Sequence, residues 1–230
     1  MSERFFLAEP PSAGRGRLVG DEARHLIRVM RCRVGDEVVV FDGRGTSWRA
    51  RVASIGRDEA VLELGAAAEE PVAQAAPVTL AVALPKGERQ KWLVEKLTEL
   101  GVARLVPLVT TRGVAEATPA AVERLGRGVI EACKQCGRDT LMAIAEPRTV
   151  AEVVGDHREE GRIVVADRAG EPWSAAVTHD RPVVVLVGPE GGFTAEELAA
   201  VDAAGGRRVS LGPNVLRIET AAIALAARLA

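Results

Sequence analysis

The chain has 230 residues, of which 47% are apolar, and its formal net charge is −2. This length and composition exclude a disordered chain and provide a hydrophobic core for one or two domains. The N-terminus has no signal-peptide pattern, and no apolar run approaches the roughly 20 residues of a membrane helix. We therefore expect a cytoplasmic protein that does not enter a membrane.

The net charge argues against a nucleic-acid-binding protein, but the distribution of arginine does not. Between Arg15 and Arg33, six arginines stand against two acids, a local charge of +4. Arginine suits bidentate phosphate contacts and base stacking, which favours RNA. A GC-rich genome, which favours arginine codons, is the alternative explanation.

The cysteines Cys32, Cys133 and Cys136 are too few for a disulfide framework. Cys133 and Cys136 have CxxC spacing, but a zinc site would lack its second pair of ligands. A redox motif would lack its usual flanking residues. We therefore predict no metal site and two reduced cysteines on a helix.

Residues 1–70 have the pattern of a small β-barrel. EVVVFDGRGTSWRARVASI alternates around Asp42-Gly43, which predicts a hairpin, and EAVLEL predicts the next strand. DEARHLIRVMR has helical spacing. The low-complexity stretch GAAAEEPVAQAAP (residues 65–77) contains two prolines and predicts a linker.

From Val78 onwards, apolar runs alternate with helical patterns. Strands are predicted at VTLAVAL, VARLVPLVT, RIVVAD, PVVVLV and RRVSLG. Helix starts are predicted at Thr118, followed by Pro119, and at capping boxes that begin at Thr149 and Thr194. Because the strands are apolar on both faces, we predict a parallel sheet covered by helices.

Two Gly-Pro turns follow neighbouring strands, in VVVLVGPEGGFTAEEL and in RRVSLGPNVLRIETAAIAL. Ligands of open parallel sheets bind beyond the carboxyl ends of the strands, where both turns are expected. The glycines of the first turn permit close approach of a ligand, and Glu190 favours a cationic or zwitterionic ligand over a phosphate. A tight connection with purely structural glycines is the alternative.

The second turn places Arg217 and Glu219 before a helix that is apolar on almost all sides. Such a helix should be buried all round, inside the domain or against a second subunit. The two charges are then costly unless they are paired or used. An Arg217–Glu219 pair that merely caps the helix is the alternative.

LVGPEGGFTAEEL followed by LGPNVLRIETAAIA resembles the RsmE family, the 16S rRNA (uracil-N3) methyltransferases of the SPOUT class. RFFL, HLIRVMRCRVGDEVVVFDG, ALPKGERQKWLVEKLTELGVARLVPLVTTR and EACKQCGR resemble further blocks of the family in order, so the resemblance covers essentially the whole chain. The chain departs from the pattern at Asn214, Ile218 and Leu141–Met142. Arg217, Glu219 and Thr220 of the LRxET core are intact.

The resemblance implies an N-terminal PUA-like small β-barrel (1–70) and a C-terminal SPOUT α/β domain with a trefoil knot (76–230). It implies methylation of N3 of a specific uridine in 16S rRNA, with S-adenosylmethionine as cofactor, the small ribosomal subunit as partner and a homodimer. A SPOUT enzyme acting on a ribose 2′-hydroxyl or a tRNA base is one alternative. A non-catalytic RNA-binding or assembly factor is another.

Site residues follow from the resemblance and from the turns. Arg217 is the expected cation beside the ionising uracil, and Glu219 would orient it or accept a proton. The expected cofactor-binding residues are Leu186, Gly188, Glu190, Gly191, Leu211, Gly212, Val215 and Leu216. The expected RNA-binding residues are Arg24, Arg28, Arg31, Arg112 and Arg138. The first three share one face of an α-helix, for which a solvated cationic face is the alternative.

Overall fold

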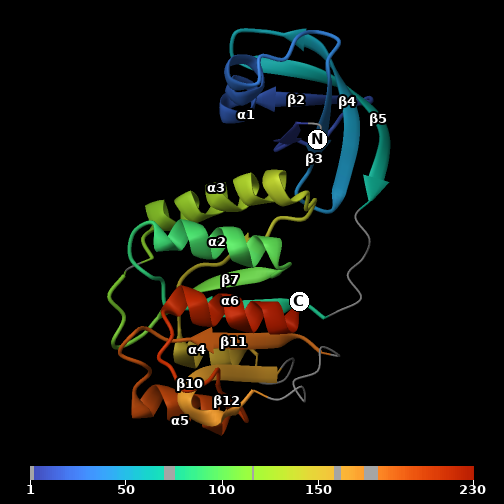
Figure 1. Cartoon of the computed structure of the whole chain (residues 1–230). Helices are drawn as coiled ribbons and strands as arrows, with labels where there is room; N and C mark the ends of the chain where they lie inside the picture. Colours follow the sequence, from blue (N-terminus) through green and yellow to red (C-terminus); the bar gives the residue numbers. More distant parts are fainter. Residues whose placement is uncertain (1–2, 70–75, 116, 158–161, 174–180) are drawn as a thin grey trace. The chain divides into compact units, whose positions relative to one another are not determined.

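The computed structural model describes the chain except residues 1–2, 70–75, 116, 158–161 and 174–180 (Figure 1). The chain divides into two compact units. Unit 1 comprises Met1–Val72 and Cys133–Leu141, and unit 2 comprises Ala73–Ala132 and Met142–Ala230. Residues 133–141, which lie inside the predicted range of the C-terminal domain, therefore group with unit 1.

Unit 1 is built on a curled sheet. Its strand order is β1 (Arg4–Phe6), β3 (Glu37–Phe41), β4 (Thr46–Ile55), β5 (Glu59–Glu69) and β2 (Arg15–Val19). β1 is parallel to β3, and the other neighbours are antiparallel. The predicted hairpin is confirmed as β3–β4. Register shifts between β4 and β5 increase the local twist that curls the sheet.

The predicted linker is wrong for its first residues. β5 continues to Glu69 because the long strand β4 offers it backbone partners, with Trp48 opposite Ala67 and Thr46 opposite Glu69. Ladder hydrogen bonds come from the backbone, so an alanine-rich segment can extend a strand. Residues 70–75 of the predicted linker lie outside the described part of the chain.

The predicted helix of unit 1 changes type along its length. α1 (Gly20–Arg24) continues as a π-helical turn, η1 (His25–Val29), in which the N–H of Met30 donates to the carbonyl of His25 at 2.9 Å. Arg31 lies beyond this turn with a left-handed backbone, φ 55°. The expectation that Arg24, Arg28 and Arg31 share an α-helical face is therefore wrong, because the wider π turn breaks the α-helical spacing.

Unit 2 contains the predicted parallel sheet. Its order is β12 (Arg207–Ser210), β10 (Arg162–Pro172), β11 (Val183–Val187), β6 (Val78–Val82), β7 (Arg104–Val109) and β8 (Ala143–Ile144), and β9 (Arg148–Thr149) also pairs with β7. The strand pairs formed by the described residues of this unit are all parallel. The strand order does not establish how the chain is threaded, so the trefoil knot stays a prediction.

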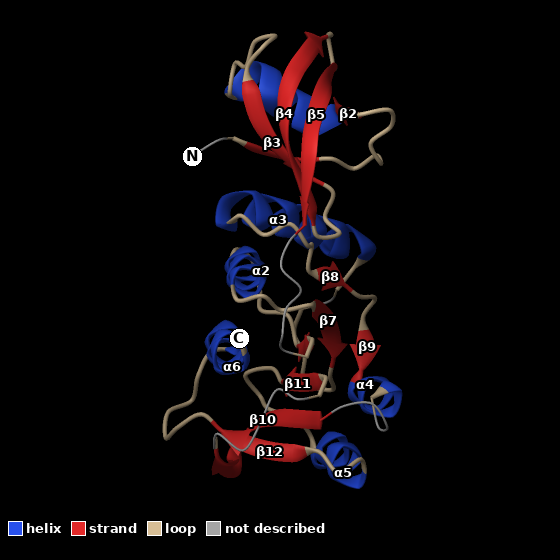
Figure 2. Ribbon diagram, turned by 90° about the vertical axis from the view of Figure 1, so that its right-hand side faces the viewer, coloured by secondary structure: helices blue, strands red, loops and turns tan. Residues whose placement is uncertain are grey.

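Helices cover both faces of this sheet (Figure 2). α2 (Arg89–Glu99) packs with α6 (Ile218–Leu229) on one face, and α4 (Val150–Asp156) packs with α5 (Ala195–Ala203) on the other. The capping boxes at Thr149 and Thr194 are confirmed. Thr118 also accepts a hydrogen bond from the Ala121 N–H, at the start of α3 (Pro119–Cys136).

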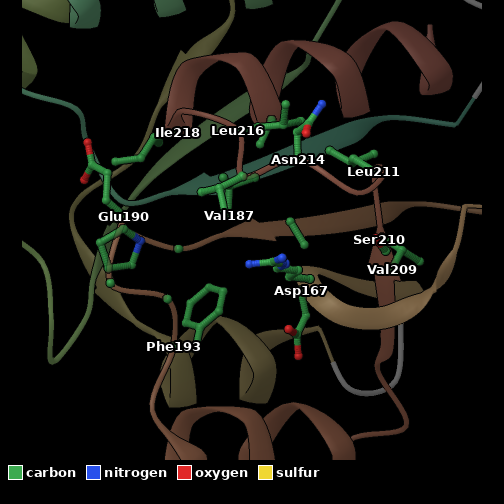
Figure 3. A pocket seen from close by; sticks show the side chains of 18 of the residues that line it. Asp167, Val187, Glu190, Phe193, Val209, Ser210, Leu211, Asn214, Leu216 and Ile218 are labelled. Carbon is green, nitrogen blue, oxygen red and sulfur yellow. The ribbon is translucent and has the colours of Figure 1, made fainter.

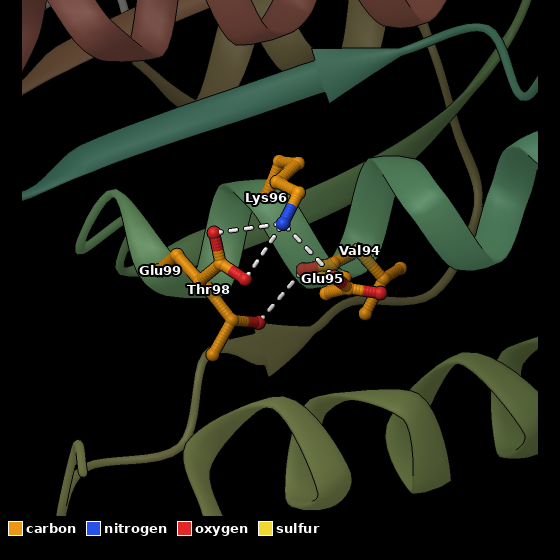
Figure 4. Close-up of polar contacts among 5 residues, drawn as sticks. All are labelled: Val94, Glu95, Lys96, Thr98 and Glu99. Carbon is orange, nitrogen blue, oxygen red and sulfur yellow. Dashed lines mark hydrogen bonds and ion pairs between the residues drawn. The ribbon is translucent and has the colours of Figure 1, made fainter. Parts of the chain in front are cut away.

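Helix α2 has two sets of polar contacts, one among charged side chains on its surface and one at a buried threonine (Figure 4). Lys96 donates to the carboxylates of Glu99 and Glu95, both at 2.9 Å, and the hydrogen bond to Glu99 is the main cause that raises the pKa of Lys96. The fully buried Thr98 donates its hydroxyl to the Val94 carbonyl at 2.8 Å. The helix can therefore bury a threonine without an unpaired hydroxyl.

Within the single chain α6 is not buried all round, so burial inside the domain alone is excluded and burial against a second subunit stays a prediction. Thr220 and Ala227 are exposed, and Ile223 and Ala224 are partly exposed. These four residues, the α6 stripe, follow i, i+3, i+4 and i+7 and share one side of the helix. The other side is buried, including Leu225, which is fully covered. Among the described residues, no helix is long and apolar enough to cross a membrane.

Candidate active site

A pocket of about 300 Å³ lies beside the carboxyl ends of β11 and β12 (Figure 3). The turn after β11, from Gly188 to Phe193, forms one wall. The turn after β12, from Leu211 to Leu216, forms the other together with Ile218 and Ala221 of α6. The two turns therefore enclose one site, as their position on a parallel sheet predicts, and the volume is within the range of small-molecule sites.

The first wall depends on glycine at the positions nearest Phe193. A Cβ on Gly188 would come within 2.9 Å of the Phe193 ring, and Gly192 has φ 68°. The Phe193 side chain, 9% exposed, packs with the core beneath the sheet and also lines the pocket. Glycine at 188 thus leaves the space in which this ring forms the pocket wall.

Arg112 holds the same turn from outside. Its Nη1 donates to the carbonyls of Gly191 at 2.8 Å and Phe193 at 3.3 Å. The N–H of the preceding residue, Thr111, donates to Glu197 Oε1 at 2.9 Å, at the start of α5. The segment after β7 therefore fixes both the turn and the helix that follows it.

The second wall is more open. Gly212 has φ 128°, a backbone conformation that side-chain-bearing residues rarely adopt, and the N–H of Gly212 donates to the Ser210 hydroxyl at 3.4 Å. Val215 is 71% exposed although it lines the pocket. An apolar side chain this exposed at a pocket rim is available to a ligand or to a partner.

Strand β10 contributes a charged part of the lining, Asp167 and Arg168. Asp167 lies 3.6 Å from Arg208 and accepts a hydrogen bond from the Ala169 N–H at 3.0 Å. Arg208 also binds Asp202, and this hydrogen bond holds the pKa of Asp202 below its ordinary value. The pocket therefore combines apolar walls with fixed carboxylates.

A buried carboxylate lies next to the pocket, where the first turn and the start of α6 meet the start of α2. Glu219, 5% exposed at its side chain, lies between the lining residues Ile218 and Ala221. Its Oε2 is 3.6 Å from Arg89 Nη1, which also lies 3.4 Å from Glu190 Oε1. Arg217 forms no ion pair with another described residue, so the alternative of an Arg217–Glu219 pair is wrong.

The structure brings together most of the predicted cofactor-binding residues. The pocket lining contains Gly188, Glu190, Gly191, Leu211, Gly212, Val215 and Leu216. Leu186 is fully buried in the core and is not in the lining. Arg217 is exposed at the start of α6.

The predicted RNA-binding arginines are divided between the units. Arg24 pairs with Asp21, Arg28 lies 3.9 Å from an acid, and Arg138 groups with unit 1. Arg112 belongs to unit 2, where it binds the first turn.

Several lining residues were not predicted from sequence. They are Ala166, Asp167, Arg168, Val187, Pro189, Gly192, Phe193, Val209, Ser210, Asn214, Ile218 and Ala221. For Asp167 and Arg168 a signal existed: charged residues end the apolar run RIVVAD in the strand beside β11.

Known proteins share the whole architecture. Residues 73–230 match the family model described as an RNA methyltransferase domain, and residues 18–65 match an RNA methyltransferase PUA domain. The predicted PUA-like and α/β domains are thereby confirmed. A curated relative from Synechocystis, ribosomal RNA small subunit methyltransferase E, is 35% identical over 208 residues, 87% of this chain and 67% of the relative.

Two solved structures are similar over nearly their full length. Ribosomal RNA small subunit methyltransferase E from Neisseria gonorrhoeae, bound to S-adenosyl methionine, has a TM-score of 0.88 with 28% identity, covering 99% of this chain and 96% of that one. A Legionella pneumophila structure with bound cofactor SAM has a TM-score of 0.91 with 26% identity, covering 100% and 97%. The chain therefore belongs to the RNA methyltransferase family that includes ribosomal RNA small subunit methyltransferase E.

Proposed function

We propose that this protein transfers a methyl group from S-adenosylmethionine to N3 of a specific uridine in the 16S rRNA of the small ribosomal subunit. The main observation behind this proposal is that two turns of an RNA methyltransferase domain enclose one pocket with apolar walls and carboxylates. The names of the relatives support a small-subunit rRNA substrate.

The pocket suits S-adenosylmethionine by its chemistry. Val187, Phe193 and Leu216 offer apolar surface for the adenine, and Asp167 and Glu190 offer carboxylates for the positive charges of the ligand. Leu186, Gly188, Gly191, Leu211, Gly212 and Val215 complete the proposed set. When bound, the cofactor supplies an electrophilic methyl carbon to the uracil N3.

The protein must favour loss of the N3 proton and hold the base in line with the methyl carbon. We assign Arg217 as a cation beside the uracil oxygens, where negative charge develops. Glu219 is the second proposed catalytic residue. Because its side chain is 5% exposed, a role in orienting a cation is better supported than direct proton transfer.

The domains divide the work in this proposal. The PUA-like domain, residues 1–70, binds RNA through Arg24, Arg28 and Arg31, while residues 76–230 carry the knotted methyltransferase site. Arg112 and Arg138 are the remaining proposed RNA contacts. Phosphate contacts release counterions, so we expect binding to weaken as salt increases.

We further propose a cytoplasmic homodimer. The α6 stripe supports a dimer because it leaves apolar and small side chains on one side of an otherwise buried helix. Sedimentation equilibrium of the wild type and of an Ile223→Glu variant tests this, since a charge on the stripe should yield monomers. A wild-type monomer at micromolar concentration contradicts the dimer.

Labelled S-adenosylmethionine, offered with small-subunit particles or with naked rRNA from a strain that lacks the enzyme, tests the function. Mapping the product by mass spectrometry should give N3-methyluridine at one position. A methylated ribose or a methylated tRNA identifies a different SPOUT enzyme. Absence of cofactor binding in calorimetry favours a non-catalytic RNA-binding factor.

A further inference from the structure

Arg89 occupies the point where three segments of unit 2 meet. It is the first residue of α2, which follows β6, and β6 pairs with β11, whose turn forms the first pocket wall. The N–H of Ala83, just after β6, still donates to the carbonyl of Val187 at 2.9 Å. The start of α2 therefore lies at the same edge of the sheet as the pocket.

The backbone at Arg89 is anchored by the next residue. Gln90 is 7% exposed, its Nε2 donates to the Pro85 carbonyl at 2.8 Å, and its Oε1 accepts from Arg124 Nη2 at 2.9 Å. Both ends of this amide are hydrogen-bonded, so the side chain of Gln90 ties the start of α2 to Pro85 and Arg124.

Two carboxylates hold the guanidinium itself. The contacts to Glu190 and to Glu219 both use Nη1, which leaves the Nε and Nη2 donors out of the interactions between described residues. Glu219 Oε2 is buried and has no hydrogen-bond partner among the described residues. A nearby cation stabilises a buried carboxylate, and Arg89 is the cation that lies 3.6 Å from Glu219 Oε2.

The charge of the cluster distinguishes it from a phosphate site. One arginine and two carboxylates sum to −1, so the cluster offers no net positive charge to a phosphate, and what it offers a substrate is the directed N–H donors of Arg89. The same arrangement tolerates a neutral base and a cationic methyl donor. The Arg89 side chain is 34% exposed, so its remaining donors are accessible from outside the protein. A hydrogen-bond donor that is already in position before the reaction stabilises the transition state most when it faces the atom on which charge develops.

We propose that Arg89 is a further catalytic residue, which donates a hydrogen bond to a uracil carbonyl oxygen as the base ionises, and that Glu190 and Glu219 position it. This inference rests on the proposed function. In the step, the N3 proton passes to water, the N3 electron pair forms the bond to the methyl carbon, and the electron pair of the broken carbon–sulfur bond stays on sulfur.

Single-turnover methyl transfer at saturating cofactor and substrate tests Arg89→Gln and Arg89→Lys. Loss of one such donor should slow Arg89→Gln by about 100-fold. Arg89→Lys should be intermediate, since lysine keeps the charge without the planar fork. Both variants should still bind S-adenosylmethionine, because Arg89 itself does not line the pocket. Arg207→Gln is the matched control, because Arg207 also lies 3.4 Å from an exposed glutamate, Glu171, and should keep the wild-type rate.

An altered substrate separates catalysis from a structural defect. In RNA with 5-fluorouridine, whose N3 is more acidic, the base ionises with less help, so the Arg89→Gln defect should shrink. Equal defects on uridine and 5-fluorouridine, or a wild-type rate for Arg89→Gln, overturn the role of Arg89. Absence of transfer by the wild type would instead contradict the proposed function.

Discussion

Replacing Gly188 by alanine places a methyl group against the wall of the pocket. The added Cβ would lie 2.9, 3.1 and 3.1 Å from three atoms of the Phe193 ring, closer than ordinary van der Waals contact. Gly188 has no left-handed backbone, so alanine brings crowding rather than backbone strain. Phe193 packs against the core on one side, and therefore its ring has room to move only towards the pocket.

The energetic cost should appear when the cofactor binds. Without ligand, the ring can relax into the pocket, whereas a bound ligand pushes it back against the new methyl group. Overpacking of this kind costs about 1–3 kcal/mol. Since 1.4 kcal/mol corresponds to a factor of ten, the Kd for S-adenosylmethionine should rise about 5- to 150-fold.

Isothermal titration calorimetry measures this Kd, and thermal unfolding without ligand shows whether the variant is folded. Gly126→Ala is the matched control, because a Cβ at Gly126 in α3 meets nothing within 4 Å. Truncating the ring in Gly188→Ala/Phe193→Ala should remove the crowding. Wild-type affinity for Gly188→Ala would refute the reasoning. So would an equal loss of affinity from the added methyl group in the Phe193→Ala background, where no ring is left to crowd.

Three further changes test the site and the fold. Arg112→Gln removes the hydrogen bonds to two carbonyls of the first turn, so the Kd for S-adenosylmethionine should rise severalfold in calorimetry. Unchanged affinity would contradict the role of Arg112 in holding this turn. Arg217→Ala should lose turnover but keep most of its cofactor affinity, whereas equal losses would assign Arg217 to the cofactor wall. Thr149→Ala should destabilise the start of α4 by about 1 kcal/mol, seen as faster amide exchange. The backbone hydrogen bond from Thr149 lowers the pKa of Glu152. The cap should therefore contribute its full stability above the ordinary pKa of 4.5 and lose it as the pH falls below that value. Amide exchange in α4 that does not change with acidification would contradict this.

Local sequence patterns predicted much of the secondary structure. The capping boxes at Thr149 and Thr194 predicted two helix starts, because the cap involves residues only three positions apart. The alternating runs around Asp42 predicted a hairpin for the same reason, and Asp42 Oδ1 indeed accepts hydrogen bonds from the N–H groups of Arg44 and Thr46. Apolar runs without alternation predicted a sheet buried on both faces.

Contacts between distant segments could not be predicted in this way. Arg89 and Glu190 are 101 positions apart, and no periodicity links them. Asp167 lies where the register of β10 against β12 shifts, between Ala166 and Glu171, and no sequence pattern indicated that shift. Arg112 was expected to contact RNA because it follows a strand. Its Nη1 donates to two carbonyls of the first turn, a contact that no sequence pattern indicated, and the contact with RNA stays a prediction.

The last helix shows why an apolar pattern can be read correctly and still mislead. Composition requires cover for α6 but does not say which molecule supplies it. The chain covers the side that carries Leu225 and leaves the α6 stripe open. At the same helix start, the carboxylate of Glu219 is buried against Arg89 rather than against its neighbour Arg217. An uncharged partner surface could cover the stripe, whereas a buried carboxylate is stabilised by a nearby cation, and the fold supplies that cation from α2.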